Sequence, residues 1–356
     1  MRTSICLFLL ILFFNPPLKS QWETSANFGK GLIYDLEFIT NQFGYAYCWP
    51  DDGSIFYIYT TDQGESWEKL NFPENETGFV QFLDENIVFL LSNGRLFKSI
   101  DRGENWNQIS TILNVNYKVM FLSETVGYAF GHNRLLKTVD GTNFSDVTPE
   151  FEQSTNAVLN NFYFKNELEG FCLGGDRDDF SGFILKTIDG GENWVYKYTN
   201  NFESYEKVHF IDDDHAIAIG CIGSNVETFD NGETWSLLDW GVPFTVVDVS
   251  NVGPDLIYVV GTVATGGGMP KNFSCSSDGG ITWTSSRTPI SPITSVEFVN
   301  ENVGFIINTF YTDSMEIFKT SVGCSSVNNT ENKNFILFSN QNIIFFRNFY
   351  TRESIC

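Results

Sequence analysis

The sequence predicts an all-β protein, a seven-bladed β-propeller of four-stranded blades that is closed by its own N-terminal strand. Three observations support this prediction. A box of the form [Ser/Thr]-x-Asp-x-Gly-x-x-Trp recurs along the chain, and a second motif alternates with it, with seven copies of each at a period of about 39 to 49 residues. No segment has a sustained helical period, which disfavours an α/β fold. Lastly, the final box lacks a Trp that the N-terminal segment supplies.

Five boxes are complete: residues 60–67, 99–106, 187–194, 228–235 and 276–283. A sixth, Thr138–Phe144, is one residue short and ends in Phe, and the seventh, Thr320–Gly323, lacks both Asp and Trp. We expect each box to form the turn between the third and fourth strands of a blade. The Asp would accept backbone N–H groups of its own turn, the Gly would supply a positive φ, and the Trp would pack into the blade interface.

This role predicts a structural function for Asp62, Gly64, Trp67, Asp101, Gly103, Trp106, Asp140, Asp189, Gly191, Trp194, Asp230, Gly232, Trp235, Asp278, Gly280 and Trp283. The alternative is that the boxes bind a ligand or calcium. It is disfavoured because the box recurs at every such turn and its Asp is already used by the backbone.

The second motif is an aromatic residue, a polar turn and a Gly-rich apolar strand. Its copies begin at Phe38, Phe82, Phe121, Phe164, Phe210 and Phe298, with a looser copy at Val249. In the first unit the alternation of apolar residues predicts four strands, over 35–40, 44–49, 55–60 and 67–72. Four short strands per unit at this period are typical of a propeller blade.

The spacing between the motifs predicts how the ring closes. Trp67 lies 15 residues before Phe82, and Trp22 lies 16 residues before Phe38, although no box precedes Trp22. We therefore expect residues 21–26 to form the fourth strand of the seventh blade, with Trp22 as its Trp. Closure of this kind removes unpaired strand edges.

The composition bounds the partners. The chain has 356 residues, a formal net charge of -23 and no run of Lys or Arg, which disfavours nucleic acid and anionic membranes. Residues 1–20 resemble a signal peptide, with Arg2 before an apolar run at 5–14. We expect a protein without a membrane span, secreted or at the surface of a bacterial envelope. The expected division is signal peptide (1–20), propeller (21–324) and linker with C-terminal tail (325–356).

Six cysteines follow the signal peptide and form no C-x-x-C pair, so zinc and redox motifs are absent. Most are expected to be buried apolar residues, and a bridge such as Cys221 to Cys275 stays open. His132, His209 and His215 have no ligand spacing. We predict no metal, no cofactor and a monomer.

The repeated boxes, such as TIDGGENW at 187–194, and alternating strands, such as FLSETVGYAF at 121–130, resemble the photosystem II stability/assembly factor-like propellers. These belong to the Asp-box (BNR repeat) group, which includes sialidases, xyloglucanases and the sortilin ectodomain. The resemblance covers residues 21–324 and implies the fold. The assembly factors carry a basic patch that this acidic chain lacks, so we do not expect a photosynthetic role. Residues 334–340 resemble the opening of a type IX secretion C-terminal sorting domain, here truncated.

The resemblance also sets the enzymatic alternative, a divergent sialidase-like glycoside hydrolase. Sialidases use three arginines and an Arg-Ile-Pro motif; this chain lacks that motif, and its propeller arginines are Arg95, Arg102, Arg134, Arg177 and Arg287. The related xyloglucanases use two carboxylates in a cleft between two propellers, and this chain is long enough for only one propeller. We therefore predict a non-catalytic binding or scaffold propeller for a protein or glycan, with no catalytic residues.

The predicted binding face lies opposite the boxes, where the second-to-third strand loops and blade connections meet. Loops carry binding residues more often than strands do, and exposed Trp or Tyr are favoured anchors. Candidate loops are 49–53, 176–179 and 265–271. The candidate binding residues are Trp49, Asp51, Asp52, Asp176, Arg177, Asp178, Trp240 and Tyr311.

Overall fold

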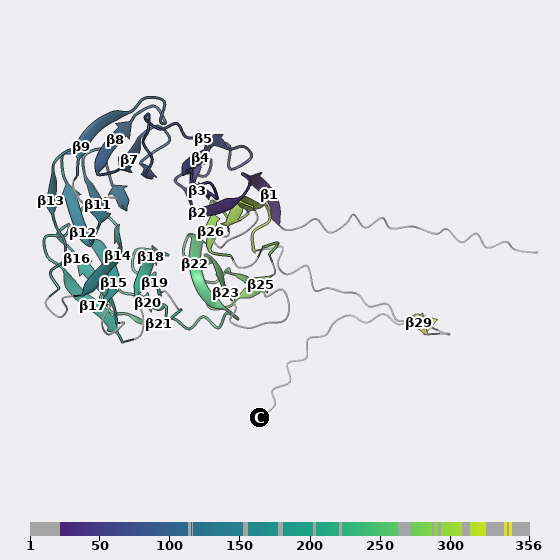
Figure 1. Cartoon of the computed structure of the whole chain (residues 1–356). Coiled ribbons are helices and arrows are strands. Elements are labelled where there is room, and N and C mark those ends of the chain that lie inside the picture. The colour runs from purple at the N-terminus through teal and green to yellow at the C-terminus, as the bar shows by residue number, and fades with distance from the viewer. Residues whose placement is uncertain are drawn as a thin grey trace, which may run out of the picture.

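The computed structural model describes residues 22–324, apart from gaps at 113–114, 116, 152–155, 177–180, 202–203, 221–222, 263–271, 287, 291–292 and 308–313, together with 338–339 and 342–343. Seven four-stranded antiparallel sheets form a ring, and the first strand of each lies toward its centre (Figure 1). The predicted fold is confirmed. Within the described residues no helix is long and apolar enough to cross a membrane.

The strands follow one another blade by blade. Blade 1 has β2 (Gly31–Phe38), β3 (Gly44–Pro50), β4 (Phe56–Thr60) and β5 (Glu68–Lys69). Blade 2 has β6 (Phe79–Phe82), β7 (Val88–Ser92), β8 (Arg95–Ser99) and β9 (Asn107–Thr111). Blade 3 has β10 (Lys118–Phe121), β11 (Gly127–Gly131), β12 (Arg134–Thr138) and β13 (Phe144–Asp146). Blade 4 has β14 (Ala157–Phe164), β15 (Gly170–Asp176), β16 (Gly182–Thr187) and β17 (Val195–Asn200).

Blade 5 has β18 (Tyr205–Phe210), β19 (Ala216–Gly220), β20 (Val226–Thr228) and β21 (Ser236–Leu237). Blade 6 has β22 (Thr245–Val252), β23 (Leu256–Thr262), β24 (Phe273–Ser276) and β25 (Thr284–Ser286). Blade 7 has β26 (Ser295–Phe298), β27 (Gly304–Ile307), β28 (Glu316–Thr320) and β1 (Trp22–Asn27). A separate two-stranded sheet pairs β29 (Phe338–Ser339) with β30 (Asn342–Ile343).

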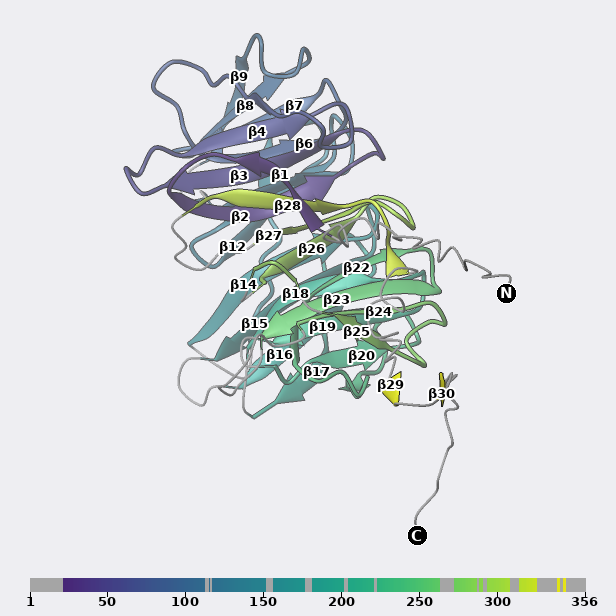
Figure 2. The ribbon, with the colours of Figure 1, turned by 90° about the vertical axis from the view of Figure 1, so that its right-hand side faces the viewer.

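The N-terminal strand closes the ring, as predicted. β1 runs antiparallel beside β28 (Figure 2). In this pairing Trp22 stands opposite Thr320. Trp22 is buried and packs edge-on against Phe298 and Phe273, with ring centroids 6.3 Å and 5.4 Å away. Trp67 packs edge-on against Phe38 at 6.2 Å in blade 1, which is the matching contact. Trp22 therefore supplies the Trp that the last box lacks.

The predicted strand limits of blade 1 need correction at its inner and outer strands: β2 ends at Phe38 rather than residue 40, and β5 spans only Glu68–Lys69 rather than 67–72. β2 begins at Gly31 rather than residue 35, and its register with β3 shifts between Ile33 and Asp35, so that Tyr34 is an extra residue. The inner strands of blades 4, 5 and 6 shift at the matching place. Such bulges bend a strand and re-aim its side chains, and here they lie next to the central lumen.

The aromatic residues of the second motif end the inner strands and join neighbouring blades. Phe38 stands opposite Gly44, where an added Cβ would lie 2.7 Å from the Phe38 ring. The glycine therefore leaves room for the ring, which stacks on Phe305 of the preceding blade at 4.7 Å. Phe121 and Phe164 repeat the stacking at 3.7 Å and 3.6 Å.

The boxes form the predicted turns. In the first box the Thr60 hydroxyl donates to Asp62 (2.7 Å) and accepts from the Gly64 N–H (2.9 Å). The Asp62 carboxylate also accepts the Ser66 N–H (2.9 Å) and hydroxyl (2.6 Å). The box at 228–235 repeats all of these bonds. Gly64 has φ +74°, and an added Cβ would lie 2.6 Å from the Phe305 ring.

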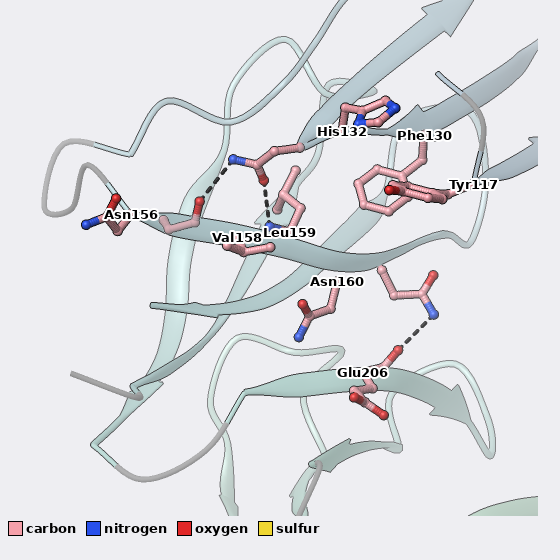
Figure 3. A pocket seen from close by; sticks show the side chains of 11 residues that line it. Tyr117, Phe130, His132, Asn156, Val158, Leu159, Asn160 and Glu206 are labelled. Carbon is pink, nitrogen blue, oxygen red and sulfur yellow. Dashed lines mark hydrogen bonds between the residues drawn. The ribbon is translucent and has the colours of Figure 1, made fainter. Parts of the chain in front are cut away.

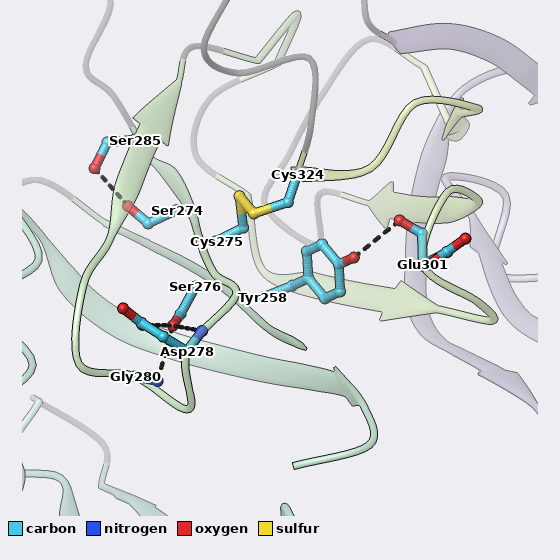
Figure 4. The surroundings of a disulfide bond; sticks show 9 residues. All are labelled: Tyr258, Ser274, Cys275, Ser276, Asp278, Gly280, Ser285, Glu301 and Cys324. Atoms are coloured by element: carbon cyan, nitrogen blue, oxygen red, sulfur yellow. Dashed lines mark hydrogen bonds between the residues drawn. A yellow bond between two sulfur atoms is a disulfide. The ribbon is translucent and has the colours of Figure 1, made fainter. Parts of the chain in front are cut away.

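A disulfide joins Cys275 in blade 6 to Cys324, which follows β28 of blade 7 (Figure 4). The bridge therefore fastens the end of the last blade to its neighbour across 49 residues of chain. Cys275 is thus paired with Cys324 and not with Cys221, the partner that the sequence left open. Cys48 and Cys172 are free and buried, as the sequence predicted for most cysteines.

Candidate functional site

The inner strands present two rings of side chains to the central lumen. Counted back from the position that Phe38 occupies near the end of the inner strand of blade 1 (Asn251 in blade 6), the second residue before it is buried in every blade, whereas the first and third are more accessible in most blades. The upper ring, at the third position, consists of Asp35, Phe79, Lys118, Asn161, Lys207, Asp248 and Ser295. The lower ring, at the first position, consists of Glu37, Gln81, Met120, Tyr163, His209, Ser250 and Glu297.

Blades 5 to 7 are fastened to one another through these rings. The Lys207 ammonium forms an ion pair with Asp248. The second oxygen of Asp248 accepts the Ser295 hydroxyl at 2.7 Å and the Val296 N–H at 3.0 Å. His209 Nε2 lies 2.7 Å from the amide oxygen of Asn251. These contacts hold blades 5 to 7 together, and the polar side chains that make them are occupied by neighbouring blades.

Blade 1 presents carboxylates with few partners. Among the described residues, Asp35 accepts a hydrogen bond only from the Leu36 N–H, at 3.0 Å, and Glu37 accepts one from the Tyr45 hydroxyl, at 2.5 Å. Neither has an ion-pair partner among the described residues. Their side chains are exposed to the lumen, yet the surrounding ring of protein limits their hydration, and this desolvation raises the pKa of both. Repulsion from Asp35 adds to the increase in the Glu37 pKa.

Glu297, on β26 of the adjacent blade 7, is half-buried. Desolvation raises its pKa to about 8, and the neighbouring carboxylates of Asp248, Glu37 and Asp35 contribute in the same direction. Four carboxylates (Asp35, Glu37, Asp248, Glu297) and two ammonium groups (Lys118, Lys207) share the two rings. The lumen thus carries an excess of two negative charges when all six groups are ionised.

A cavity of about 630 Å³ opens from the lumen beside blades 1 to 4. Its wall on blade 1 is an aromatic row, in which Trp49 and Tyr47 flank Tyr34, each with ring centroids 5.6 Å from it. Tyr47 stacks in turn on Tyr57 at 5.0 Å, and Phe79 of blade 2 lies 6.3 Å from Tyr47. We call these five residues the aromatic row. Asp35, Glu37, Lys118 and the exposed Tyr117 also line this cavity.

A second cavity, of about 790 Å³, lies between blades 3, 4 and 5 and shares Tyr117 and Asn161 with the first (Figure 3). Amide side chains dominate it, but they are used for structure. Asn133 donates to the Ala157 carbonyl (2.9 Å) and accepts the Leu159 N–H (2.7 Å), and Asn161 donates to the Glu206 carbonyl (2.8 Å). This cavity therefore offers fewer free groups to a ligand than the aromatic one.

Both cavities lie toward the face that the sequence predicted for binding. In an antiparallel four-stranded blade, the turns after the first and third strands share one face, so the boxes and the ends of the inner strands lie together. Trp49, near the end of β3, and Tyr117, before β10, lie toward the opposite face.

The predicted binding residues separate in the structure. Trp49 lines the aromatic cavity and is 43% exposed. Asp51 and Asp52 are exposed in the following turn, where the Asp52 carboxylate accepts the hydroxyl and N–H of Ser54, which lower its pKa. Trp240 is half-buried against Trp283, with ring centroids 4.8 Å apart, and so packs beside a box rather than facing the lumen.

Asp176 ends β15, and its N–H donates to the Ser181 carbonyl at 2.8 Å. Arg177, Asp178 and Tyr311 lie outside the described residues, as do Cys221, Arg287 and the loop 265–271. The three described arginines do not converge: each forms an ion pair with a different carboxylate, namely Arg95 with Glu76, Arg102 with Glu85 and Arg134 with Asp146. In the described part of the chain no group of three or more His, Cys, Asp and Glu side chains could hold a metal ion.

Residues 58–69 match the family model of the BNR/Asp-box repeat. The fold resembles YCF48 in a structure bound to a D1 peptide, with 18% identity over 85% of this chain and 97% of that one and a TM-score of 0.63. YCF48 from Cyanidioschyzon merolae is similar, with 15% identity, 84% and 98% coverage and a TM-score of 0.63. A polysaccharide lyase, PL25 ulvan lyase, is 11% identical over 85% and 96%, with a TM-score of 0.53. A comparison with curated protein sequences finds no match.

Sequence reasoning found Trp49 but missed the lumen. The available signal was the alternation within the inner strands, in which polar residues in DLEF at 35–38, KVMF at 118–121 and KVHF at 207–210 precede buried ones. In a strand that forms the inner edge of every blade, such positions face the centre of the ring. Aligning the seven inner strands on the aromatic residue that begins each copy of the second motif, with Asn251 in its place in blade 6, would have revealed both rings.

Proposed function

We propose that this chain is a non-catalytic binding or scaffold propeller, secreted or held at the cell surface, whose protein or glycan partner enters the aromatic cavity. The observation that carries the proposal is the set of large aromatic side chains left exposed around that cavity: Tyr34 is 41%, Trp49 43% and Tyr117 48% exposed. Aromatic anchors over a pocket are typical of binding hot spots. A volume of about 630 Å³ is in the usual range of ligand pockets.

The face of the cavity supports the same proposal. The Asp of each box is satisfied by its own turn, so the box face offers repeated structural turns, whereas the opposite face offers exposed rings beside unpaired carboxylates. YCF48, which shares the fold, has been captured with a peptide. That likeness shows the fold alone and supports a protein partner only by analogy.

The test is an array of peptides and glycans probed with the purified protein. Trp49→Ala and Tyr117→Ala should abolish binding of any positive ligand, because each removes an exposed ring of the cavity. Ile281→Ala is the matched control, since Ile281 is 83% exposed in the box at 276–283, on the other face. A ligand that still binds to both cavity variants, or that no longer binds to the Ile281→Ala variant, would contradict the proposal.

One observation favours a second candidate, a glycoside hydrolase of the Asp-box group. A carboxyl group that holds its proton to a pH of about 8, as Glu297 does, is suited to general acid catalysis, and other carboxylates share the lumen with it. The discriminating assay is release of reducing ends from a panel of polysaccharides. Release that Glu297→Gln abolishes, with binding retained, would establish the enzyme; the binding proposal predicts no release.

A further inference from the structure

We infer that the aromatic cavity binds a basic side chain, an arginine or lysine of a peptide partner, between the aromatic row and the carboxylates of Asp35 and Glu37. The inference rests on the proposed function and narrows its ligand to a peptide with a positive charge. It depends on the pairing of charges in the lumen, on the aromatic wall and on the placement of the two lumen lysines.

The first argument is unbalanced charge. Asp248 has its cation, Lys207, whereas Asp35 and Glu37 have none among the described residues. Both carboxylates stand two residues apart on one face of β2, so they repel each other within a ring of protein that screens them less than open water would. Lys118 and Lys207 lower both pKa values from a distance and so offset part of this charge, but neither forms an ion pair with Asp35 or Glu37. A cation bound in direct contact would relieve the remaining repulsion.

The response of the two carboxyl groups to a cation follows from their surroundings. Desolvation and mutual repulsion raise the pKa of Glu37, and desolvation raises that of Asp35. A cation placed beside them favours their ionised forms and lowers both pKa values. Binding in mildly acidic solution should therefore release protons, whereas an uncharged ligand should release none.

The second argument is the wall of the cavity. The aromatic row presents Trp49 and Tyr34 at the rim, and both rings are more than two-fifths exposed. The faces of Trp and Tyr rings attract ammonium and guanidinium groups, and the attraction increases when water is displaced. Guanidinium also forms paired hydrogen bonds with carboxylates. The Tyr34, Tyr47 and Trp49 members of the row come from β2 and β3, the paired strands that also carry Asp35, so one side chain can reach both.

The third argument is that the lumen lysines do not occupy this position. The Lys118 ammonium donates to the Asn161 amide oxygen at 2.8 Å and to the Phe162 carbonyl at 3.3 Å, both on blade 4. Desolvation lowers the pKa of Lys118, which weakens its hold on its proton. Lys207 is held by Asp248 on blade 6. Neither ammonium group therefore contacts Asp35 or Glu37, although both offset part of the charge of blade 1 from a distance.

The experiment is calorimetric titration of the full-length protein with acetyl-Ala-Ala-Arg-Ala-Ala-amide, and with the same peptide carrying citrulline, which has the shape of arginine without its charge. We expect the arginine peptide to bind at least about ten-fold more tightly, equal to about 1.4 kcal/mol. Titrations in two buffers of different ionisation enthalpy should show proton release for arginine only.

The combined variant Asp35→Asn with Glu37→Gln should bind both peptides equally, because it keeps the shape of the cavity and removes its charge. Glu74→Gln is the matched control: it removes one exposed carboxylate from the loop between blades 1 and 2 and should keep the preference for arginine. Absence of arginine-peptide binding, or an arginine preference that survives in the double variant, would overturn the inference. Equal binding of both peptides that Trp49→Ala abolishes would overturn it while leaving the proposed function standing.

Discussion

Replacement of Trp22 by alanine tests whether the N-terminal strand closes the ring. Trp22 is 3% exposed and packs between Phe273 and Phe298. A buried Trp removes about 150 to 250 Å² from water, which at about 25 cal/mol per Å² corresponds to roughly 4 to 6 kcal/mol. Alanine retains a little of this burial. We therefore expect Trp22→Ala to lower the free energy of unfolding by about 4 kcal/mol, within the usual range for such substitutions.

The assay is urea unfolding followed by far-ultraviolet circular dichroism, which is insensitive to the loss of one Trp fluorophore. Thr24→Ala is the matched control, because Thr24 lies on the same strand, opposite Phe318, but is exposed. It should change the free energy of unfolding by less than about 0.5 kcal/mol. If the two variants unfold at the same urea concentration as the unmodified protein, β1 does not hold the seventh blade and the closure described above is wrong.

Three further predictions concern stability. Because the pKa of Glu297 is raised from 4.5 to about 8, the folded protein binds more protons than the unfolded chain between these pH values, and its stability falls as pH rises through this range. The Glu297→Gln variant should therefore have a higher melting temperature than the unmodified protein above pH 8 and the same melting temperature below pH 4.5. An equal change in melting temperature at both pH values would contradict the raised pKa of Glu297. The Thr234 hydroxyl and N–H lower the pKa of Asp230 to about 2, so this box should lose its stabilisation as pH falls from 3.8 towards 2; Asp230→Ala should destabilise the protein at neutral pH, and the melting difference should shrink on acidification. Removing the disulfide by Cys275→Ser with Cys324→Ser opens a loop of 49 residues and should lower the free energy of unfolding, measured in urea, by about 4 kcal/mol. A change near zero would show that the disulfide does not hold the last blade.

The boxes could be predicted because their hydrogen bonds join residues close together in the sequence, and the closure could be predicted because it follows from counting the repeats. The eight residues of the box contain every hydrogen-bond partner of the Asp62 carboxylate, so the motif alone indicates the geometry of the turn. The last box lacks its Trp and Trp22 has no box of its own. Both are exceptions to the regular repeat, and such exceptions can be found by counting along the sequence without knowing the structure. The Cys275–Cys324 bridge could not be deduced, because it depends on how two adjacent blades are placed.

The binding cavity could be predicted only at its rim. Trp49 stands out as an exposed aromatic next to a turn, but Tyr34 faces the cavity because a bulge adds one residue to β2. No local sequence pattern predicts that bulge. The carboxylates of Asp35 and Glu37 acquire significance only when seven inner strands are brought around one axis and Lys207 is seen to be held by Asp248. Trp240 shows the converse, since an aromatic residue in a connection became part of blade packing.

The most direct test of the account is a crystal structure of the protein with acetyl-Ala-Ala-Arg-Ala-Ala-amide. The account predicts the guanidinium group in the aromatic cavity, against the rings of Tyr34 and Trp49 and within hydrogen-bond distance of Asp35 or Glu37. A peptide seated on the face of the Asp boxes, or one whose arginine points away from the lumen, would contradict it.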